Sequence, residues 1–548
     1  SELIRGFLLS GMPCPSSCPP GLLALMAPGL ALMATFSLPS QAGDRRALPV
    51  EKPPGVKGRT LILLDVNTKS PVRIISENFL SLQLDPSIIH DGWLDFLRVV
   101  QRCLCLLPCT EHSLLGYEGP GTDFLVFSSP NISHNRGSGF YHSLVGQRLD
   151  IVRSDIALDK QKGCKIAQHP DIMLELQREK AAQMHLVLLK EQFSNTYSNL
   201  TLTARSLDKL YNFADCSGLH LIFALNALRR NPNNSWNSSN ALSLLKYSAS
   251  KKYNISWELG NEPNNYRTLI GRSVNGSQLG KDYTQLRSLL QLIRTYSRAH
   301  LYGPNIGRPR KNVIGFLEGF LKVAGGTVDA VTWQHYYIDG RVAKVTDFLK
   351  TRLLDTLSDQ IRKIQKVVNT YTPGKKIWLE GVGTTSTGGM NNLSDSYAAG
   401  FLCATGTRQP PMVLPQPPPP PSCPNHLVDQ NFNPLPDYWL SLLYKRLIGP
   451  KVLAIHVAGL QRKPRPGRVI RDKLRIYAHC TSYHNHNYVR GSITLYIINL
   501  HRSRKKIKLA GTLRDKIVHQ YLLQPYGKDG LHSKSVQLNG QPLATVGE

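Results

Sequence analysis

The feature that most restricts the fold is an alternation of short apolar runs and longer amphipathic runs between residues 219 and 379. The short runs predict strands at Leu219–Leu228, Ile255–Leu259, Ala330–Tyr337 and Ile377–Leu379. The longer runs have the apolar spacing of helices, at Ser239–Tyr253, Tyr283–Leu301, Asn312–Val323 and Val345–Tyr371. Strands that alternate with helices indicate a parallel sheet covered by helices, so we expect an α/β protein.

The length of 548 residues allows two folded units. A (β/α)8 TIM barrel takes about 250 residues, which leaves room for a second domain. After residue 451 the chain has short β-rich runs with turn signals, which predict a C-terminal β-sandwich. The expected segments are a leader (1–45), an N-terminal strand and the start of the barrel (58–97), the rest of the barrel (151–450) and a truncated β-sandwich (451–548).

Two segments interrupt the barrel pattern. Residues 98–150 lose the periodicity, and residues 402–424 contain a polyproline tract that cannot form a central strand or a helix interior. These segments fall where the second and eighth barrel strands are expected. We therefore predict that the second strand has a degraded strand pattern and that the polyproline tract replaces the eighth strand. Incorrect translation or alternative splicing would explain both segments. Because the first strand of a barrel pairs with the second and the eighth, we expect Phe79–Leu84 to lack good neighbours and to expose sheet edges.

The charge of the chain predicts a polyanionic partner. Lys and Arg number 66 against 37 Asp and Glu, a formal charge of +29, which suits nucleic acid, acidic lipid or sulfated glycan. The apolar run Gly21–Phe36 resembles a secretory signal and is too short and interrupted for a transmembrane anchor. Seven glycosylation sequons fit secretion: Asn131, Asn199, Asn233, Asn237, Asn254, Asn275 and Asn392. We therefore expect an extracellular glycoprotein that meets sulfated glycans. The sequence contains no nucleic-acid-binding motif that would favour nucleic acid as the partner.

The cysteines and histidines predict neither a metal site nor a cofactor. Ten cysteines are too few for a disulfide scaffold at this length, and they form no paired Cys-X-X-Cys knuckles. His484 and His486 lack a third ligand at metal spacing, so a polar turn is the better interpretation.

The strand Ile255–Leu259 runs directly into Gly260, Asn261, Glu262 and Pro263. This pattern predicts a buried parallel strand that delivers a carboxylate to its C-terminal end, where barrel enzymes carry their catalytic residues. A solvated Asn-Glu-Pro turn is the alternative.

Five motifs in one order resemble the heparanases of glycoside hydrolase family 79, which are retaining endo-β-glucuronidases of heparan sulfate. The motifs are Asn226–Leu228, Trp257–Pro263, Tyr302–Pro304, Thr332–Tyr337 and Leu435–Leu440. The chain is most similar to the branch of this family that binds heparan sulfate without hydrolysing it. The resemblance covers most of residues 58–97 and 151–401 and resumes at residue 425.

The resemblance implies a mechanism with two carboxylates about 5 Å apart, one acting as acid/base and one as nucleophile. Glu262 matches the acid/base. The family pattern Trp-Leu-Gly-Glu reads Trp-Leu-Glu-Gly here, so Glu380 stands one position early and Gly381 takes the nucleophile's place. Because successive side chains of a strand face opposite ways, we expect Glu380 to point away from the catalytic direction. An active hydrolase that uses Glu262 and Glu380 stays the alternative, as does a solvated strand-end Glu380.

The resemblance also implies a sugar-binding rim and a disulfide. The rim residues are Asn226, Asn261, His335 and Tyr337, and the disulfide joins Cys164 to Cys216. The arginine of the family's second strand is absent from Leu115–Gly119. Sulfate and carboxylate groups are bound by Arg and Lys, and the candidate clusters are Arg308, Arg310 and Lys311, then Arg462, Lys463, Arg465 and Arg468, then Lys505 and Lys506. Each cluster is alternatively a solvated face.

The expected function is that of a secreted protein that binds heparan sulfate proteoglycans and heparin and lacks hydrolase activity. Heparanase as a partner or competitor follows from the resemblance alone.

Overall fold

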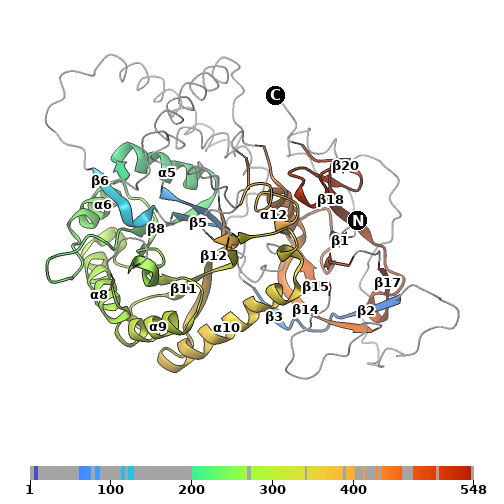
Figure 1. The fold of residues 1–548 in the computed structure, drawn as a ribbon, viewed down its shortest axis with the longest axis horizontal. Helices are drawn as coiled ribbons and strands as arrows, with labels where there is room; N and C mark the ends of the chain where they lie inside the picture. Colours follow the sequence, from blue (N-terminus) through green and yellow to red (C-terminus); the bar gives the residue numbers. More distant parts are fainter. Residues whose placement is uncertain are drawn as a thin grey trace, which may run out of the picture.

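The computed structural model describes residues 5–9, 61–75, 81–86, 113–117, 121–128, 200–267, 273–339, 342–386, 390–400, 411–413, 427–429, 433–458, 473–501 and 505–544. Two units lie side by side. In Figure 1, parallel strands surrounded by helices occupy the left side and a larger, mostly antiparallel sheet occupies the right side.

Among the described residues, eight parallel strands form the central sheets of the first unit. They are β4 (Ser81–Leu84), β5 (Ser113–Tyr117), β8 (Leu219–Leu225), β9 (Ile255–Leu259), β10 (Tyr302–Ile306), β11 (Ala330–Asp339), β12 (Lys376–Ser386) and β13 (Pro411–Val413). The pairing order is β13-β4-β5-β8-β9 in one sheet and β10-β11-β12 in another. A parallel bridge between Trp257 and Leu301 links β9 to the start of β10, and β12 contacts β13. The parallel strands therefore form a curled α/β sheet.

Helices cover the outside of this sheet, as Figure 1 shows. They are α5 (Ala204–Cys216), α6 (Ser239–Ser250), α8 (Gly276–Leu292), α9 (Lys311–Ala324) and α10 (Thr351–Tyr371). Side-chain oxygens cap two of the helix starts: Thr203 accepts from the Ser206 amide and Asn275 from the Gln278 amide. A short parallel pair, β6 (Leu125–Ser128) and β7 (Leu200–Thr203), lies near α6.

Helices α8 and α9 approach each other closely because α8 begins with a glycine. A Cβ on Gly276 would lie 1.9 Å from the carbonyl oxygen of Phe316. A side chain at this position would therefore push α8 away from α9.

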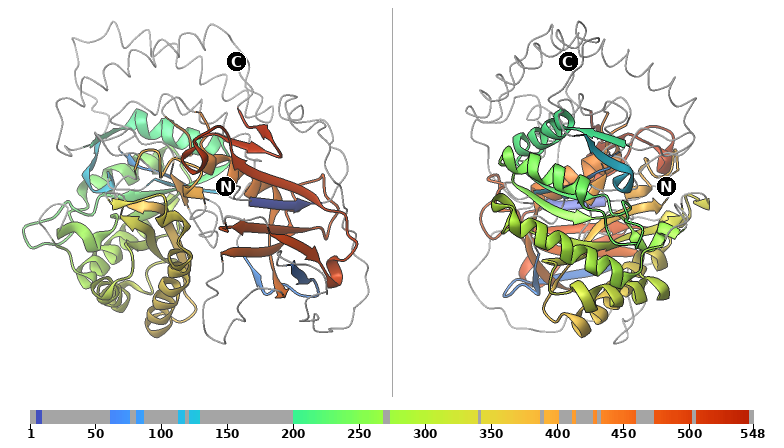
Figure 2. Two further views of the ribbon diagram at one scale, coloured as in Figure 1. Left: turned by 45° about the vertical axis from the view of Figure 1, so that its right-hand side comes forward. Right: turned by 90° about the vertical axis from the view of Figure 1, so that its left-hand side faces the viewer.

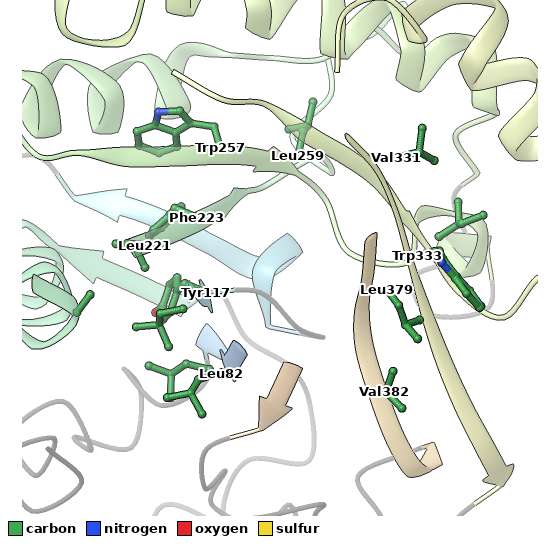
Figure 3. Packing of buried hydrophobic residues seen from close by; sticks show 14 of the residues in the cluster. Leu82, Tyr117, Leu221, Phe223, Trp257, Leu259, Val331, Trp333, Leu379 and Val382 are labelled. Atoms are coloured by element: carbon green, nitrogen blue, oxygen red, sulfur yellow. The ribbon is translucent and has the colours of Figure 1, made fainter. Parts of the chain in front are cut away.

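A row of aromatic side chains packs the core between the strands and the helices. Figure 3 shows Tyr117, Phe223 and Trp257 on β5, β8 and β9. The ring centroids of Tyr117 and Phe223 are 4.9 Å apart, and those of Phe223 and Trp257 are 5.9 Å apart. The row continues to Tyr296, whose ring lies edge-on at 5.1 Å from Trp257. Each of these buried side chains stabilises the fold by about 1.5–3 kcal/mol.

The expectation that the first barrel strand lacks good neighbours is wrong for Ser81–Leu84. This strand, β4, pairs in parallel with β5 on one side and β13 on the other. Sheet pairing uses the backbone, and the second strand keeps two completely buried side chains, Leu115 and Tyr117, despite its altered sequence. The proline of β13 is its first residue, a position that tolerates the missing donor. Most of residues 98–150 and 402–424 lies outside the described residues.

The other elements largely follow the expected pattern, with shifted ends. Strand β12 continues to Ser386, well beyond the predicted strand Ile377–Leu379, because its backbone stays paired with β11 as far as Asp339. Helix α12 (Pro436–Leu447) begins at a proline, which lacks only a donor that the first helical turn leaves unpaired.

The second unit is built on ten strands. They are β1 (Arg5–Leu9), β2 (Leu61–Asn67), β3 (Arg73–Ile74), β14 (Ile448–Ala458), β15 (Leu474–Thr481), β16 (Ile493–Asn499), β17 (Lys506–Leu509), β18 (His519–Pro525), β19 (Val536–Leu538) and β20 (Gln541–Pro542). The order is β17-β2-β14-β15-β16-β1-β18-β19-β20, with β3 also on β14. Only the β17–β2 pair is parallel among these described strands. The sandwich predicted from the sequence stays a prediction.

Part of the predicted leader is included in this sheet. Strand β1 pairs antiparallel with both β16 and β18, and Figure 2 shows it within the antiparallel unit. The signal-like run Gly21–Phe36 lies outside the described residues. Within the described ranges, none of the helices has the length and apolar character that a membrane crossing requires.

A buried ion pair joins the two units. Arg475 on β15 donates to Asp355 on α10 at 2.6 Å, and both side chains are 11% exposed. A second connection ties the segment after β12 to the antiparallel sheet, since the Tyr397 hydroxyl donates to the Leu523 carbonyl at 2.8 Å. Lys534 also pairs with Asp395 at 2.6 Å.

Replacing Arg475 with Met should destabilise the protein by about 3 kcal/mol, because Asp355 would keep a buried charge without its cation. Urea unfolding measures the loss. The matched control is Arg362→Met, which breaks an exposed pair with Asp359 and should cost less than about 1 kcal/mol. Equal losses for the two variants would contradict a structural role for the buried pair.

Candidate functional site

Strand β9 ends in a turn that only glycine can begin. Gly260 has φ +82°, and a Cβ there would lie 2.3 Å from the Tyr266 hydroxyl and 2.9 Å from the Ala227 Cβ. Glu262 itself has φ +43°, a left-handed conformation that is strained for a residue with a side chain. Its amide donates to the Asn305 carbonyl at 3.0 Å, so the turn is fixed against the end of β10.

Glu262 is placed to act as an acid. Its Oε2 accepts from Asn265 Nδ2 at 2.7 Å. Burial raises the pKa of Glu262, and the bond from Asn265 offsets part of that rise. A raised pKa favours the protonated form, which is the form that the predicted acid role requires.

A network of amide side chains connects the ends of β9, β10 and β11. Gln334 Nε2 donates to Asn261 Oδ1 at 2.7 Å and to Asn305 Oδ1 at 2.8 Å. The Tyr336 hydroxyl donates to Gln334 Oε1 at 3.3 Å. The three amide residues are at most 6% exposed. Of this network, the sequence predicts only Asn261 as a site residue.

His335 and Tyr337 do not join this network. They share a face of β11 with Trp333, with ring centroids 6.1 Å from Trp333 to His335 and 4.7 Å from His335 to Tyr337. Alternation along the strand gives the opposite face to Gln334 and Tyr336. The sequence predicts the strand itself. It assigns His335 and Tyr337 to the rim, whereas the residues that face the rim are Gln334 and Tyr336, one position earlier in each case. The apolar Val331 and Trp333 mark the packed face in the sequence and could have set the alternation.

His335 stays neutral in this position. Its side chain is completely buried, and burial lowers its pKa to about 3, with a further contribution from the charge of Arg308. A buried neutral imidazole on the packed face cannot reach a bound polysaccharide.

Asp123 holds two chain segments of the rim in place through its carboxylate. Its Oδ1 accepts from the Ala227 amide at 2.9 Å and its Oδ2 from the Asn261 amide at 3.1 Å. One carboxylate therefore holds the chain after β8 and the chain after β9 together. Asp123 lies within the aperiodic segment 98–150, and nothing local in the sequence marks its role.

Glu380 lies in the interior of the parallel unit, on β12. Burial raises the pKa of its carboxyl group, and the approach of Glu258 on β9 and Thr332 on β11 offsets part of that rise. The register between β11 and β12 shifts here, because Trp333 pairs with Leu379 but Gln334 pairs with Gly381. Glu380 is the extra residue of this β-bulge. It faces Glu258, and it shares no hydrogen-bond partner with Glu262 within the described residues.

This result changes the expected reason for the displacement of Glu380. Leu379 and Val382 belong to one packed cluster although they are three residues apart, as Figure 3 also shows. The bulge therefore interrupts the strict alternation of side chains along β12. Glu380 points toward Glu258 because it is the extra residue of the bulge, and not because the whole strand presents its opposite face.

Three cations follow Gly307, which lies next to Glu262. Arg308 is half-buried in the loop after β10, and Arg310 and Lys311 are exposed at the start of α9. Gly307, next to Arg308, donates its amide to Asn264 Oδ1 at 2.9 Å, and a Cβ on it would lie 3.0 Å from Glu262 Oε1. None of the three cations has an acidic partner in the described part of the chain. Burial and the charge of Arg310 lower the pKa of Arg308, so an anion would stabilise its charged form.

The remaining predicted residues are dispersed. Asn226 uses its amide locally, donating to the Leu125 carbonyl at 3.0 Å and accepting from the Leu228 amide at 2.8 Å. Lys505 and Lys506 lie before and at the start of β17, in the other unit. Arg462, Lys463, Arg465 and Arg468 lie outside the described residues, as do Cys164, Asn131 and Asn199. Cys216 ends α5, and its predicted bridge stays a prediction.

Four sequon asparagines are exposed, namely Asn233, Asn254, Asn275 and Asn392, and Asn237 is partly exposed. No group of three or more His, Cys, Asp or Glu side chains in the described ranges is arranged to hold a metal ion.

The pH dependence of stability should report on Asp123, whose pKa burial raises to about 6. A carboxyl group with a raised pKa favours the folded state below its unfolded pKa and loses that contribution as pH rises through the folded pKa. Urea unfolding of wild type and Asp123→Asn should therefore diverge between about pH 4 and 7, with wild type losing about 2–3 kcal/mol relative to the variant. A difference that stays constant across this range would show that Asp123 does not titrate there.

Comparisons with known proteins agree with this geometry. The family model "Glycosyl hydrolase family 79, N-terminal domain" matches residues 168–404. The chain is 77% identical over 541 residues to inactive heparanase-2 of Homo sapiens, covering 98% of this chain and 91% of that protein. It is 42% identical over 490 residues to heparanase of Mus musculus, covering 88% and 87%.

Among solved structures, AbfB, a family 51 α-L-arabinofuranosidase from Bifidobacterium longum, superposes with a TM-score of 0.52 at 11% identity, covering 88% of this chain and 94% of that one. This likeness concerns the fold alone. The extent and level of identity to the curated relatives lead to one conclusion: the chain belongs to the heparanase family of glycoside hydrolase family 79.

Proposed function

We propose that this chain is a secreted protein that binds heparan sulfate and heparin on a glycoside hydrolase scaffold, does not hydrolyse them, and can compete with heparanase for them. The observation that carries the proposal is the position of Glu380, which is buried beside Glu258 as the extra residue of the β-bulge, while Gly381 pairs with Gln334 in the place that the resemblance assigns to the nucleophile. The name of the human relative, inactive heparanase-2, supports the same conclusion.

The geometry argues against the alternative of an active retaining hydrolase. That mechanism needs a second ionised carboxylate across the glycosidic bond from Glu262. Burial raises the pKa of Glu380, which favours its protonated form, so it is a poor nucleophile as well as a displaced one. Glu262 retains the features of an acid, but an acid alone does not complete the retaining reaction.

Binding is supported by the charge around Glu262. Arg308, Arg310 and Lys311 combine with the positive end of α9, and all four features favour sulfate or carboxylate groups. The formal charge of +29 adds a long-range attraction for a polyanion. Asn261 and Glu262 supply hydrogen-bonding groups at the same end of the sheet, and we assign them to sugar contacts.

The scaffold we propose is a (β/α)8 barrel with β13 as its eighth strand, followed by a β-sandwich. The contact of β12 with β13 supports closure of the parallel sheet. Disulfide formation between Cys164 and Cys216 and glycosylation at the sequons belong to the same proposal of a secreted protein in the extracellular matrix and at the cell surface.

Replacing Arg308, Arg310 and Lys311 with Ala should weaken heparin binding at least tenfold, because each charge-assisted hydrogen bond contributes about 1.5–3 kcal/mol. The salt concentration that elutes the protein from a heparin column measures this loss. The control replaces Arg362, Lys363 and Lys366 on α10, which are exposed and remove the same charge. Equal effects of both triples would mean that only net charge matters.

Heparan sulfate chains incubated with the wild-type protein should keep their length when analysed by size. Because hydrolysis on this scaffold requires Glu262, Glu262→Gln provides the control. Shortening that disappears in this variant would identify an active hydrolase and refute the proposal.

A further inference from the structure

The space beside Gly381 is already filled by another side chain. An ideal Cβ on Gly381 would lie 2.8 Å from Cγ and from Cδ of Gln334, and 2.9 Å from its Oε1. Distances below 3.0 Å do not occur between a real Cβ and a packed neighbour, so one of the two groups would have to move. The two residues are direct neighbours in the β11–β12 pairing.

Gln334 cannot move without losing its hydrogen bonds. Its Nε2 donates to Asn261 and Asn305, and its Oε1 accepts from Tyr336. Gln334 is 2% exposed, so water does not replace these partners in place. Displacing it would leave the amide oxygens of two buried asparagines short of a donor, which is costly in a buried network.

Position 381 therefore requires glycine because of the neighbouring Gln334 side chain, and not because of its own backbone conformation. Gly381 is absent from the glycines of the described chain that have positive φ, so its conformation suits any residue. The obstacle to a side chain at 381 is the packed amide of Gln334.

We propose that Gln334 occupies the nucleophile's position, so that the site is closed both by the absence of a carboxylate at 381 and by the Gln334 side chain that fills the space. The conclusion that the site is closed to catalysis rests on the proposed absence of hydrolysis. The packing of Gln334 against Gly381 is independent of that proposal. A carboxylate restored at 381 meets Gln334 before it reaches a sugar. Polysaccharide is then bound along the exposed cations beside Glu262 rather than with a sugar seated against β12.

A double-mutant cycle tests the packing. Gly381→Ala should lower the thermal unfolding midpoint by several degrees in the wild-type background. In the Gln334→Ala background the same substitution should cost less than half as much, because the obstructing side chain is gone. Equal losses in the two backgrounds would overturn the proposal. The control is Gly326→Ala, where an added Cβ would have no heavy atom within 4 Å, and it should leave the midpoint nearly unchanged in both.

The functional arm uses the exchanged pair Glu380→Gly with Gly381→Glu, with and without Gln334→Ala. Shortening of heparan sulfate only when Gln334 is also replaced, and its loss on adding Glu262→Gln, would support the inference. Equal shortening by the exchanged pair with Gln334 intact would overturn it. The unfolding cycle involves no polysaccharide, so a failure of packing is distinguishable from a failure of the proposed binding function.

Discussion

The burial of the Glu380 carboxyl group beside Glu258 constrains the rest of the site. Burial raises the pKa of Glu380, and interactions with Glu258 and Thr332 offset part of that rise. The approach of Glu380 on β12 to Glu258 on β9 places Glu380 in the interior of the parallel unit. The β-bulge at Glu380 then brings Gly381 opposite Gln334. The loss of a nucleophile, the glycine and the amide network thus follow from one local arrangement of β12.

The end of the parallel sheet consequently combines the carboxyl group of Glu262 with a set of buried, mutually bonded amides. Glu262 keeps its strained turn and its contact with Asn265, whereas the amides of Asn261, Asn305 and Gln334 bond to one another. Asp123 holds this arrangement in place through two backbone amides. The cations after β10 are left open to solvent. Such a surface is suited to holding a polyanion by charge, without the distortion of a sugar ring that hydrolysis requires.

The sequence predicts the elements of this fold better than their contacts. Strand Ile255–Leu259 is predicted with its observed bounds, because an apolar run ending in glycine is a strong local signal. The identity of the rim residues on β11 depends on which side of a strand faces inward, a property set by packing partners far along the chain. Asp123 and the neighbours of β4 escape prediction for the same reason, since their partners lie far along the chain and in segments without periodicity. The displacement of Glu380 is visible in the sequence, but its position beside Glu258 is not.

The capping role of Asn275 has a consequence for glycosylation. A glycan is attached to the side-chain nitrogen of asparagine, whereas α8 is capped by the oxygen of Asn275. Asn233 and Asn237 likewise use only their oxygens, each accepting from the hydroxyl and amide of the serine two residues later. Sugar at these three positions would therefore leave the local backbone conformation unchanged, so that folding and carbohydrate attachment make separate demands on the same side chain.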